Sequence, residues 1–174
     1  MRYVKQFIGR ILLLVAIDQV VKIIISKRFM NQEFSIIGNL ISFQPKQNIN
    51  LTWGGNFVGI LSNIWLALII NILVIVVLLS GYSFYRNKKN NPSMSVNILH
   101  ISGMAGAICS LIDKIFWGGS LDFIQIYNFF ICDIKDCYLT IAECFLLVIG
   151  LKHEKEISFK EYIEYCLKKN ETNT

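Results

Sequence analysis

The sequence has few charged residues and lacks the usual signatures of metal and phosphate chemistry. Only 17% of its 174 residues are charged, whereas 54% are hydrophobic, so an ordinary soluble domain of this size is excluded. Its five cysteines show no paired metal-ligand spacing, and their odd number argues against a disulfide framework. There is no Gly-rich phosphate loop, no Ser/His pairing and no His/Cys cluster beside His100. We therefore expect neither a metal nor a cofactor.

The formal net charge of +5 does not indicate a nucleic-acid partner. The Lys and Arg residues lie at the ends of apolar segments and in a mixed-charge tail, not along one basic stripe. This distribution is typical of a protein that is oriented in a membrane.

Long apolar segments predict an all-α membrane protein with four transmembrane helices in a single domain, 1–174. A helix needs about 20 residues to cross the hydrocarbon of a bilayer. The expected spans are 6–25, 64–84, 96–117 and 136–151, and the last is short enough to need flanking residues. Residues 152–174 form a charged tail, which we expect to be a solvated helix or a frayed end.

The basic residues predict that both termini and the tail 152–174 face the cytoplasm. Six of them lie at the ends assigned to that side: Arg2, Lys5, Arg10, Arg86, Lys88 and Lys89. Three others lie in the opposite loop: Lys27, Arg28 and Lys46. The bias is therefore incomplete, although it favours cytoplasmic termini.

Two loops then lie outside the cytoplasm. Residues 27–63 mix β-forming residues with Gly and Asn, including Phe34 to Phe43 and the turn-like segment Trp53 to Asn56. This pattern predicts a small extracytoplasmic sheet. Residues 118–135 are rich in aromatic side chains, which suit the membrane interface.

Four acidic residues converge at one depth on this topology. Asp18 and Asp113 lie late in outward-going spans, Asp136 begins an inward-going span, and Asp122 lies in the loop between the last two. Ionisable residues in membranes are costly and indicate function by default. For Asp18, an ion pair with Lys22 one helical turn away favours a structural role.

The roles of the other three acids are inferred from the charged residues near them in the sequence. Asp113 adjoins Lys114, and a structural role and a functional role remain equally open for Asp113. Asp122 and Asp136 have no opposite charge at helical spacing, because Lys135 adjoins Asp136 and is expected to point elsewhere on the helix.

A close pair of carboxylates can hydrolyse a peptide, because one keeps a proton while the other deprotonates water. Proton carriers also place acids in membrane spans, and Glu143, two turns beyond Asp136, keeps that alternative open. Carriers, however, show repeat symmetry and midplane sites.

The third span has small residues at every fourth position: Ser102, Gly106 and Ser110. This spacing predicts that another helix approaches closely and holds Asp113 in place.

Five motifs in order resemble the lipoprotein signal peptidases (signal peptidase II) up to about Leu151. Residues 18–22 (DQVVK) fit D-Q-x-x-K, and 48–54 (NINLTWG) resemble N-x-G-x-A-F-[SG]. Residues 105–114 (AGAICSLIDK) resemble G-G-A-x-G-N-x-x-D-R, 121–123 (LDF) resemble V-D-F, and 132–136 (CDIKD) resemble F-N-x-A-D.

The resemblance implies cleavage of diacylglyceryl-modified bacterial prolipoproteins just before the lipidated cysteine, in the cytoplasmic (inner) membrane, with an active site near its outer face. Asp122 and Asp136 would be the catalytic pair of an aspartic protease without cofactor. Six residues would bind substrate or support the site: Asp18, Lys22, Asn48, Ser110, Asp113 and Lys114. The partners would be prolipoproteins and membrane lipids, and we expect a monomer.

Among the departures from the family pattern, Asn50, Ser110, Lys114 and Asp133 stand where it has Gly, Asn, Arg and Asn. Lys114 lacks the bidentate geometry of a guanidinium, and Ser110 is a shorter hydrogen-bonding arm than Asn. A negative charge at Asp133, one turn from Asp136, is expected to raise the pKa values of the pair. A divergent active enzyme is the first interpretation, and an inactive relative that binds lipoprotein signal peptides is the second.

Overall fold

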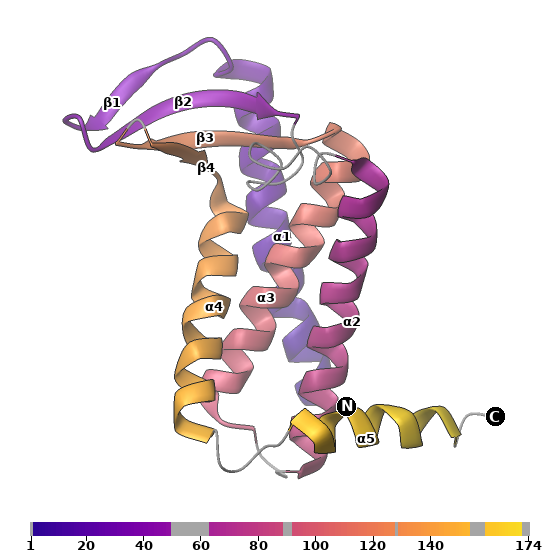
Figure 1. The fold of residues 1–174 in the computed structure, drawn as a ribbon. Coiled ribbons are helices and arrows are strands. Elements are labelled where there is room, and N and C mark those ends of the chain that lie inside the picture. Colours follow the sequence, from indigo (N-terminus) through magenta and orange to yellow (C-terminus); the bar gives the residue numbers. More distant parts are fainter. Residues whose placement is uncertain (1, 50–62, 89–91, 128, 154–158, 172–174) are drawn as a thin grey trace.

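A bundle of four long helices carries a sheet across one end (Figure 1). The structure is a computed structural model that describes residues 2–49, 63–88, 92–127, 129–153 and 159–171. The long helices are listed in chain order: α1 (Arg2–Arg28), α2 (Ile64–Lys88), α3 (Met94–Ile112), which continues as the π-helical turn η3 (Asp113–Trp117), and α4 (Ile134–His153). These positions agree with the four helical segments expected from the sequence.

The hydropathy of the helices supports a membrane location. The helix α2 and the continuous helix Met94–Trp117 are long and apolar enough to cross a bilayer, with mean hydropathies of 2.8 and 1.5. The central helix, α3, contacts α1, α2 and α4. The outer faces of α1 and α4 expose large apolar side chains, including Leu12, Leu13, Leu146 and Leu147. That all four long helices span the membrane stays a prediction.

The sheet is larger than the sequence predicted. Its antiparallel strands follow the order β1 (Phe34–Ile37), β2 (Ile41–Asn48), β3 (Ser120–Ile126) and β4 (Phe130–Cys132). The strands β1 and β2 agree with the sheet expected in the first loop. The strands β3 and β4 correct the interpretation of residues 118–135 as an aromatic loop. The turn-like segment 53–56 lies outside the described residues.

The alternation of side chains along β3 fixes the sheet to the bundle. Leu121 and Phe123 are buried with Ile25 of α1 on one face of the strand, so Ser120 and Asp122 project from the other face, toward α3 and α4. The asparagine of β2 opposite Ser120 is Asn48. Residues from the two loops that were expected outside the cytoplasm therefore meet at this end of the bundle.

A glycine pair makes the tight connection between η3 and β3. Gly118 adopts the left-handed conformation, with φ of 64°, and ends the helix. A Cβ atom on Gly119 would lie 2.3 Å from the backbone oxygen of Asn48. Only glycine therefore allows the chain to pass so close to β2, and this contact places the start of β3 beside the end of α3.

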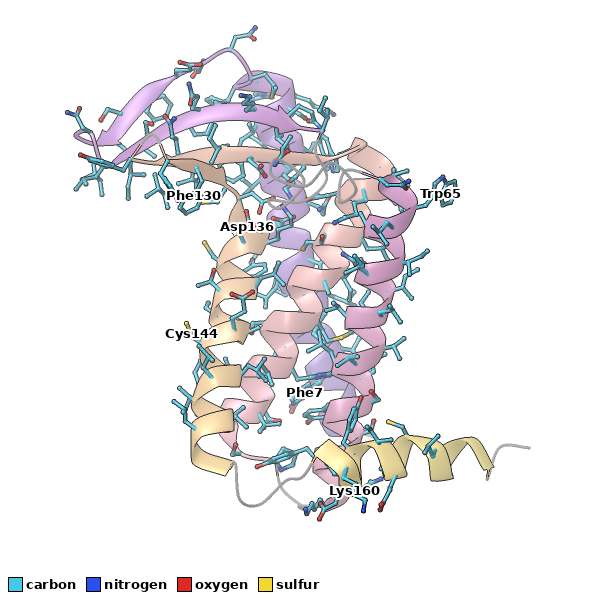
Figure 2. All side chains as sticks on the ribbon, viewed as in Figure 1. Phe7, Trp65, Phe130, Asp136, Cys144 and Lys160 are labelled. Carbon is cyan, nitrogen blue, oxygen red and sulfur yellow. The ribbon has the colours of Figure 1, made fainter. Side chains whose placement is uncertain are left out.

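The helix α5 (Phe159–Glu171) crosses the opposite end of the bundle, near the N-terminus (Figure 1). It packs on α2: Tyr162 and Ser80 share a hydrogen bond of 2.6 Å, and Asn87 donates to Tyr165 at 3.0 Å. The tail was expected to be a solvated helix or a frayed end, and its described part is a helix that packs on α2. Figure 2 shows Lys160 on α5 at this end and the exposed Trp65 projecting from α2 near the sheet.

Candidate active site

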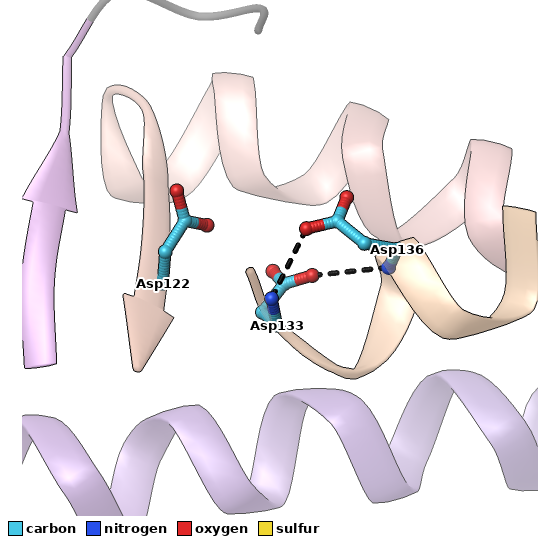
Figure 3. A group of neighbouring side chains, drawn as sticks. All are labelled: Asp122, Asp133 and Asp136. Atoms are coloured by element: carbon cyan, nitrogen blue, oxygen red, sulfur yellow. Dashed lines mark hydrogen bonds between the residues drawn. The ribbon is translucent and has the colours of Figure 1, made fainter. Parts of the chain in front are cut away.

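Asp122 and Asp136 come together from different elements. Asp122 lies on β3, not in a loop as the sequence suggested, and Asp136 lies in the first turn of α4. With Asp133, each offers a carboxylate oxygen within 4.8 Å of the others (Figure 3). The side chain of Asp122 is 7% exposed, whereas that of Asp136 is 41% exposed. Asp136 is therefore the acid that a substrate can reach most easily.

Both acids line a cavity of about 480 Å³ between the sheet and the adjoining ends of α3 and α4. Its polar lining includes four of the six residues expected to bind substrate or support the site: Asn48, Ser110, Asp113 and Lys114. Its apolar lining includes Phe130, Ile131 and Leu139. Such a cavity combines apolar walls with a few convergent polar groups, as binding sites usually do. The rest of the Asn48 motif, 50–54, lies outside the described residues.

Asp122 is held by two hydrogen-bond donors. Asn48 Nδ2 donates to Oδ2 at 3.0 Å, and Ser120 Oγ donates to Oδ1 at 2.7 Å. Burial raises the pKa of Asp122 above its ordinary value of 3.8, and it outweighs the opposite effects of Lys135, Ser120 and Asn48. The position and protonation of this carboxyl are therefore controlled by its surroundings.

Asp136 is held by Asp133, the residue that precedes α4. The Asp133 backbone N–H donates to Asp136 Oδ2 at 3.0 Å, and the Asp136 N–H donates to Asp133 Oδ1 at 3.2 Å (Figure 3). This reciprocal arrangement is a capping box, with aspartate in place of the usual glutamate. It fixes the carboxyl of Asp136 against the start of its own helix.

Besides burial, the negative charge of Asp133 raises the pKa of Asp122, as the sequence suggested, but two cations compensate this charge. Burial raises the pKa of Asp133 itself, but Lys135 and Lys22 outweigh this effect, so that the pKa lies below 3.8. The ammonium groups lie 2.5 Å (Lys135) and 2.7 Å (Lys22) from Asp133 Oδ2. Asp133 is therefore an ionised partner of two cations.

Lys135 points into the site, and the expectation that it points elsewhere is wrong. Its ammonium nitrogen lies 3.8 Å from an oxygen of Asp122 and 3.8 Å from an oxygen of Asp136. It lies 3.3 Å from Asp113 and donates to Ser120 Oγ at 2.6 Å. Helical spacing missed this contact because Lys135 pairs mainly with residues outside its own helix. An ammonium among several carboxylates stays protonated, so Lys135 cannot act as the base of a Ser/Lys pair with Ser120.

Lys22 joins the support residues into one buried network. Its ammonium lies 2.9 Å from Asp18, as the sequence predicted, and also 2.6 Å from Asp113. The side chains of Lys22 and Asp18 are fully buried. Asp18 also accepts the backbone N–H of Lys135 at 3.1 Å, which ties α1 to the start of α4.

Asp113 therefore pairs with Lys22, whereas Lys114 takes a different partner. Lys114 donates to Ser110 Oγ at 2.5 Å and to Ser110 O at 3.3 Å. Both side chains line the cavity, where the family pattern has arginine and asparagine. The two departures thus form one hydrogen-bonded unit.

Sequence reasoning missed two further polar residues of the network. Gln19 donates to Asp113 at 3.2 Å and accepts from the Trp117 indole at 3.1 Å. It was visible only as the second residue of the D-Q-x-x-K motif. Ser120, which bonds Asp122 and Lys135, had no signal in the sequence, because its role depends on the alternation along β3.

The small residues of α3 allow α4 to approach, as expected. A Cβ atom on Gly106 would lie 2.6 Å from Leu139 Cδ2. Ala142 of α4 would lie 3.5 Å from a Cβ atom on Gly103. This close packing brings the first turn of α4 beside the end of α3, where Asp113 lies.

Comparisons with known proteins agree with this geometry. The family model described as signal peptidase (SPase) II matches residues 10–152. Lipoprotein signal peptidases of Staphylococcus aureus strains JH9 and Newman are each 31% identical over 167 residues, which cover 90% of this chain and 97% of the relative.

Two solved structures, both described as bacterial membrane enzymes, share the fold. One has a TM-score of 0.72 and 24% identity, covering 90% of this chain and 94% of its own. The other has a TM-score of 0.67 and 23% identity, covering 89% and 96%. With the family match over most of its length, the chain belongs to the signal peptidase II family of aspartic-type signal peptidases.

Proposed function

We propose that the chain cuts diacylglyceryl-modified prolipoproteins before the lipidated cysteine, with Asp122 and Asp136 as the catalytic pair. The observation that carries this proposal is the convergence of the two acids, from β3 and α4, in one cavity. Membership of the signal peptidase II family supports the same substrate class.

The chemistry requires the pair to share one proton. The ionised carboxylate takes a proton from water as the water oxygen bonds to the peptide carbonyl carbon, and the carbonyl oxygen takes the proton of the other carboxyl. As the tetrahedral diol collapses, one of its hydroxyl groups returns a proton to the ionised carboxylate, the carbon–nitrogen bond breaks, and the proton of the other carboxyl passes to the leaving amine, so that the pair again holds one proton. Burial, which raises the pKa of Asp122, favours a pair that retains a proton.

The remaining cavity residues would position the peptide. Asn48 lies against Asp122, and the Ser110–Lys114 unit lies on the α3 side of the same cavity. Lys114 can donate to a substrate carbonyl as a single point of charge, whereas a guanidinium would offer two parallel donors. We therefore expect the departures at these positions to change substrate affinity more than the chemical step.

We also propose four spans, with both termini and the tail 152–174 in the cytoplasm and the sheet outside. The N-terminus and α5 lie at one end of the bundle and the sheet at the other (Figure 1), and Arg86 and Lys88 lie at the first end. Single cysteines introduced at the exposed residues Gln32 and Glu164 test this arrangement. Labelling of position 164 from outside an intact cell would contradict it.

We propose further that the enzyme acts as a monomer among membrane lipids, because both acids and their described partners come from one chain. The proton carrier is not favoured, since the acids lie at the sheet end of the bundle. A single assay tests the main proposal. The purified protein in lipid is incubated with a diacylated prolipoprotein and with the same precursor lacking the lipid. Release of the signal peptide from the first alone is expected, whereas binding without release would favour the inactive relative.

A further inference from the structure

Lys135 places a positive charge beside both proposed catalytic acids. Its ammonium lies 3.8 Å from an oxygen of each proposed catalytic acid, Asp122 and Asp136. Its side chain is only 9% exposed, so solvent screens these interactions weakly. A positive charge close to two acids that share one proton acts on the ionisation of both.

We propose that Lys135 is a positioning residue that sets the pH range of cleavage, by balancing the charge of Asp133 beside the catalytic pair. This inference rests on the proposed function. Lys135 Nζ lies 2.5 Å from Asp133 Oδ2, its shortest ion pair. Positions 133 and 135 both depart from the pattern F-N-x-A-D, and the two charges that they introduce are opposite. Each compensates the other next to Asp136.

The charged groups around Lys135 come from several elements that surround the site. They are Asp18 and Lys22 of α1, Asp113 and Lys114 of η3, Asp122 of β3, Asp133, and Asp136 of α4. Lys46, opposite Asp122 on β2, is exposed, and Glu143 lines the cavity two turns along α4. Counting only the seven groups listed and Lys135, five carboxylates face three ammonium groups. Because the catalytic pair keeps one proton, these groups carry four negative and three positive charges, and loss of Lys135 raises the excess of negative charge from one to two.

A purely structural role for Lys135 makes a different prediction. If its ammonium only neutralises Asp133 during folding, its loss lowers the amount of folded protein without moving the pH profile of each folded molecule. If it sets the charge beside the pair, its loss lets the acids keep their protons to a higher pH. The pH profile normalised to folded protein therefore separates the two roles.

The experiment compares signal-peptide release across a pH series for four variants in lipid. Lys135→Met removes the charge with little change in volume. The pH profile of cleavage is expected to move to higher pH by about one to three units, which is the effect of one opposite charge at this distance from a carboxylate. Asp133→Asn is expected to move the profile down. The double variant restores the net charge and is expected to return close to the unmodified profile. Lys135→Arg keeps the charge and serves as the matched control.

Failure of this inference is distinguishable from failure of the proposed function. If Lys135→Met and the unmodified protein have the same profile while Asp122→Asn is inactive, the inference is wrong and the catalytic pair stands. If the unmodified chain shows no cleavage, infrared titration of the Asp122 carboxyl, assigned by comparison with Asp122→Asn, replaces the activity readout. An unchanged or lowered midpoint in Lys135→Met then overturns the role of Lys135.

Discussion

Asp133 and Asp136 cap each other at the start of α4, through hydrogen bonds of 3.0 and 3.2 Å between the backbone N–H of each and the carboxylate of the other. The second acid is a proposed catalytic residue, whereas the first is an ionised partner of Lys22 and Lys135. A helix terminus thus links the buried charge network to the reacting group.

The cap makes the side chain at position 133 important beyond its charge. Asp133→Asn and Asp133→Ala remove the same charge, but only asparagine can still accept the Asp136 N–H. We expect the alanine variant to be less stable than the asparagine variant by about 1 kcal/mol, the usual contribution of an N-cap. Thermal unfolding of both in the same detergent measures this difference. Equal stabilities would show that the cap is unimportant.

Lys22 should matter more for folding than any one of its partners. Lys22→Met leaves Asp18 and Asp133 without their shared cation, and breaking a buried ion pair on one side costs about 3–5 kcal/mol. Asp18→Asn leaves Lys22 with Asp113 and Asp133 and should cost less. The double variant, Asp18→Asn with Lys22→Met, should yield more folded protein than Lys22→Met alone. A lower yield of the double variant would refute the pairing.

Two glycine substitutions are expected to change the stability of the folded protein in opposite directions. Gly106→Ala places a Cβ atom 2.6 Å from the Leu139 side chain, which must shift at the α3–α4 contact. Overpacking of this kind costs about 1–3 kcal/mol. Gly150→Ala on α4 meets no atom within 4 Å and should stabilise the helix by about 0.5–1 kcal/mol. A change of the melting temperature in the same direction in both variants would contradict the close contact between Gly106 and Leu139.

Asp122 and Asp133 should affect stability with opposite dependence on pH. The pKa of Asp122 is raised in the folded protein, so its contribution to stability is present below pH 3.8 and is lost as the pH rises through its folded pKa. The pKa of Asp133 is lowered, so its contribution is present above pH 3.8 and is lost as the pH falls through its folded pKa.

The measurement is the melting temperature of each asparagine variant relative to the unmodified protein. Asp122→Asn should gain relative stability as the pH rises above 3.8 and through the raised pKa of Asp122. Asp133→Asn should gain relative stability as the pH falls below 3.8 and through the lowered pKa of Asp133. If the relative stability of both variants changed with pH in the same direction, either the burial of Asp122 or the ion pairing of Asp133 would be misassigned.

The sequence predicted the helical segments because apolar runs of sufficient length have few alternative structures. It also predicted the Asp18–Lys22 pair, since residues four apart share a helix face. The strand β3 was missed because its four-residue alternation, Ser120 to Phe123, is short and lies among aromatic residues that also suit an interface. Its partner β2 is more than 70 residues away in the chain, as in the Asn48–Asp122 bond.

The role of Lys135 was missed for a related reason. Spacing along one helix gives contacts within that helix, whereas Lys135 reaches Asp113, Asp122 and Ser120 on other elements. The charge of Asp133 was judged without Lys22, which comes from the first helix of the chain. Long-range pairs of this kind become visible only when the fold brings distant elements together.

The most direct test of the central claim is signal-peptide release from a diacylated prolipoprotein by Asp122→Asn and Asp136→Asn, normalised to folded protein. Each change keeps the shape of the side chain but removes a group that exchanges a proton. We expect both variants to stay folded and to lose cleavage by at least about 100-fold, the lower end of the rate factor that general acid–base catalysis contributes. Glu33→Gln, at an exposed carboxylate before β1, should keep full activity. Full activity in either aspartate variant would contradict the assignment of Asp122 and Asp136 as the catalytic pair.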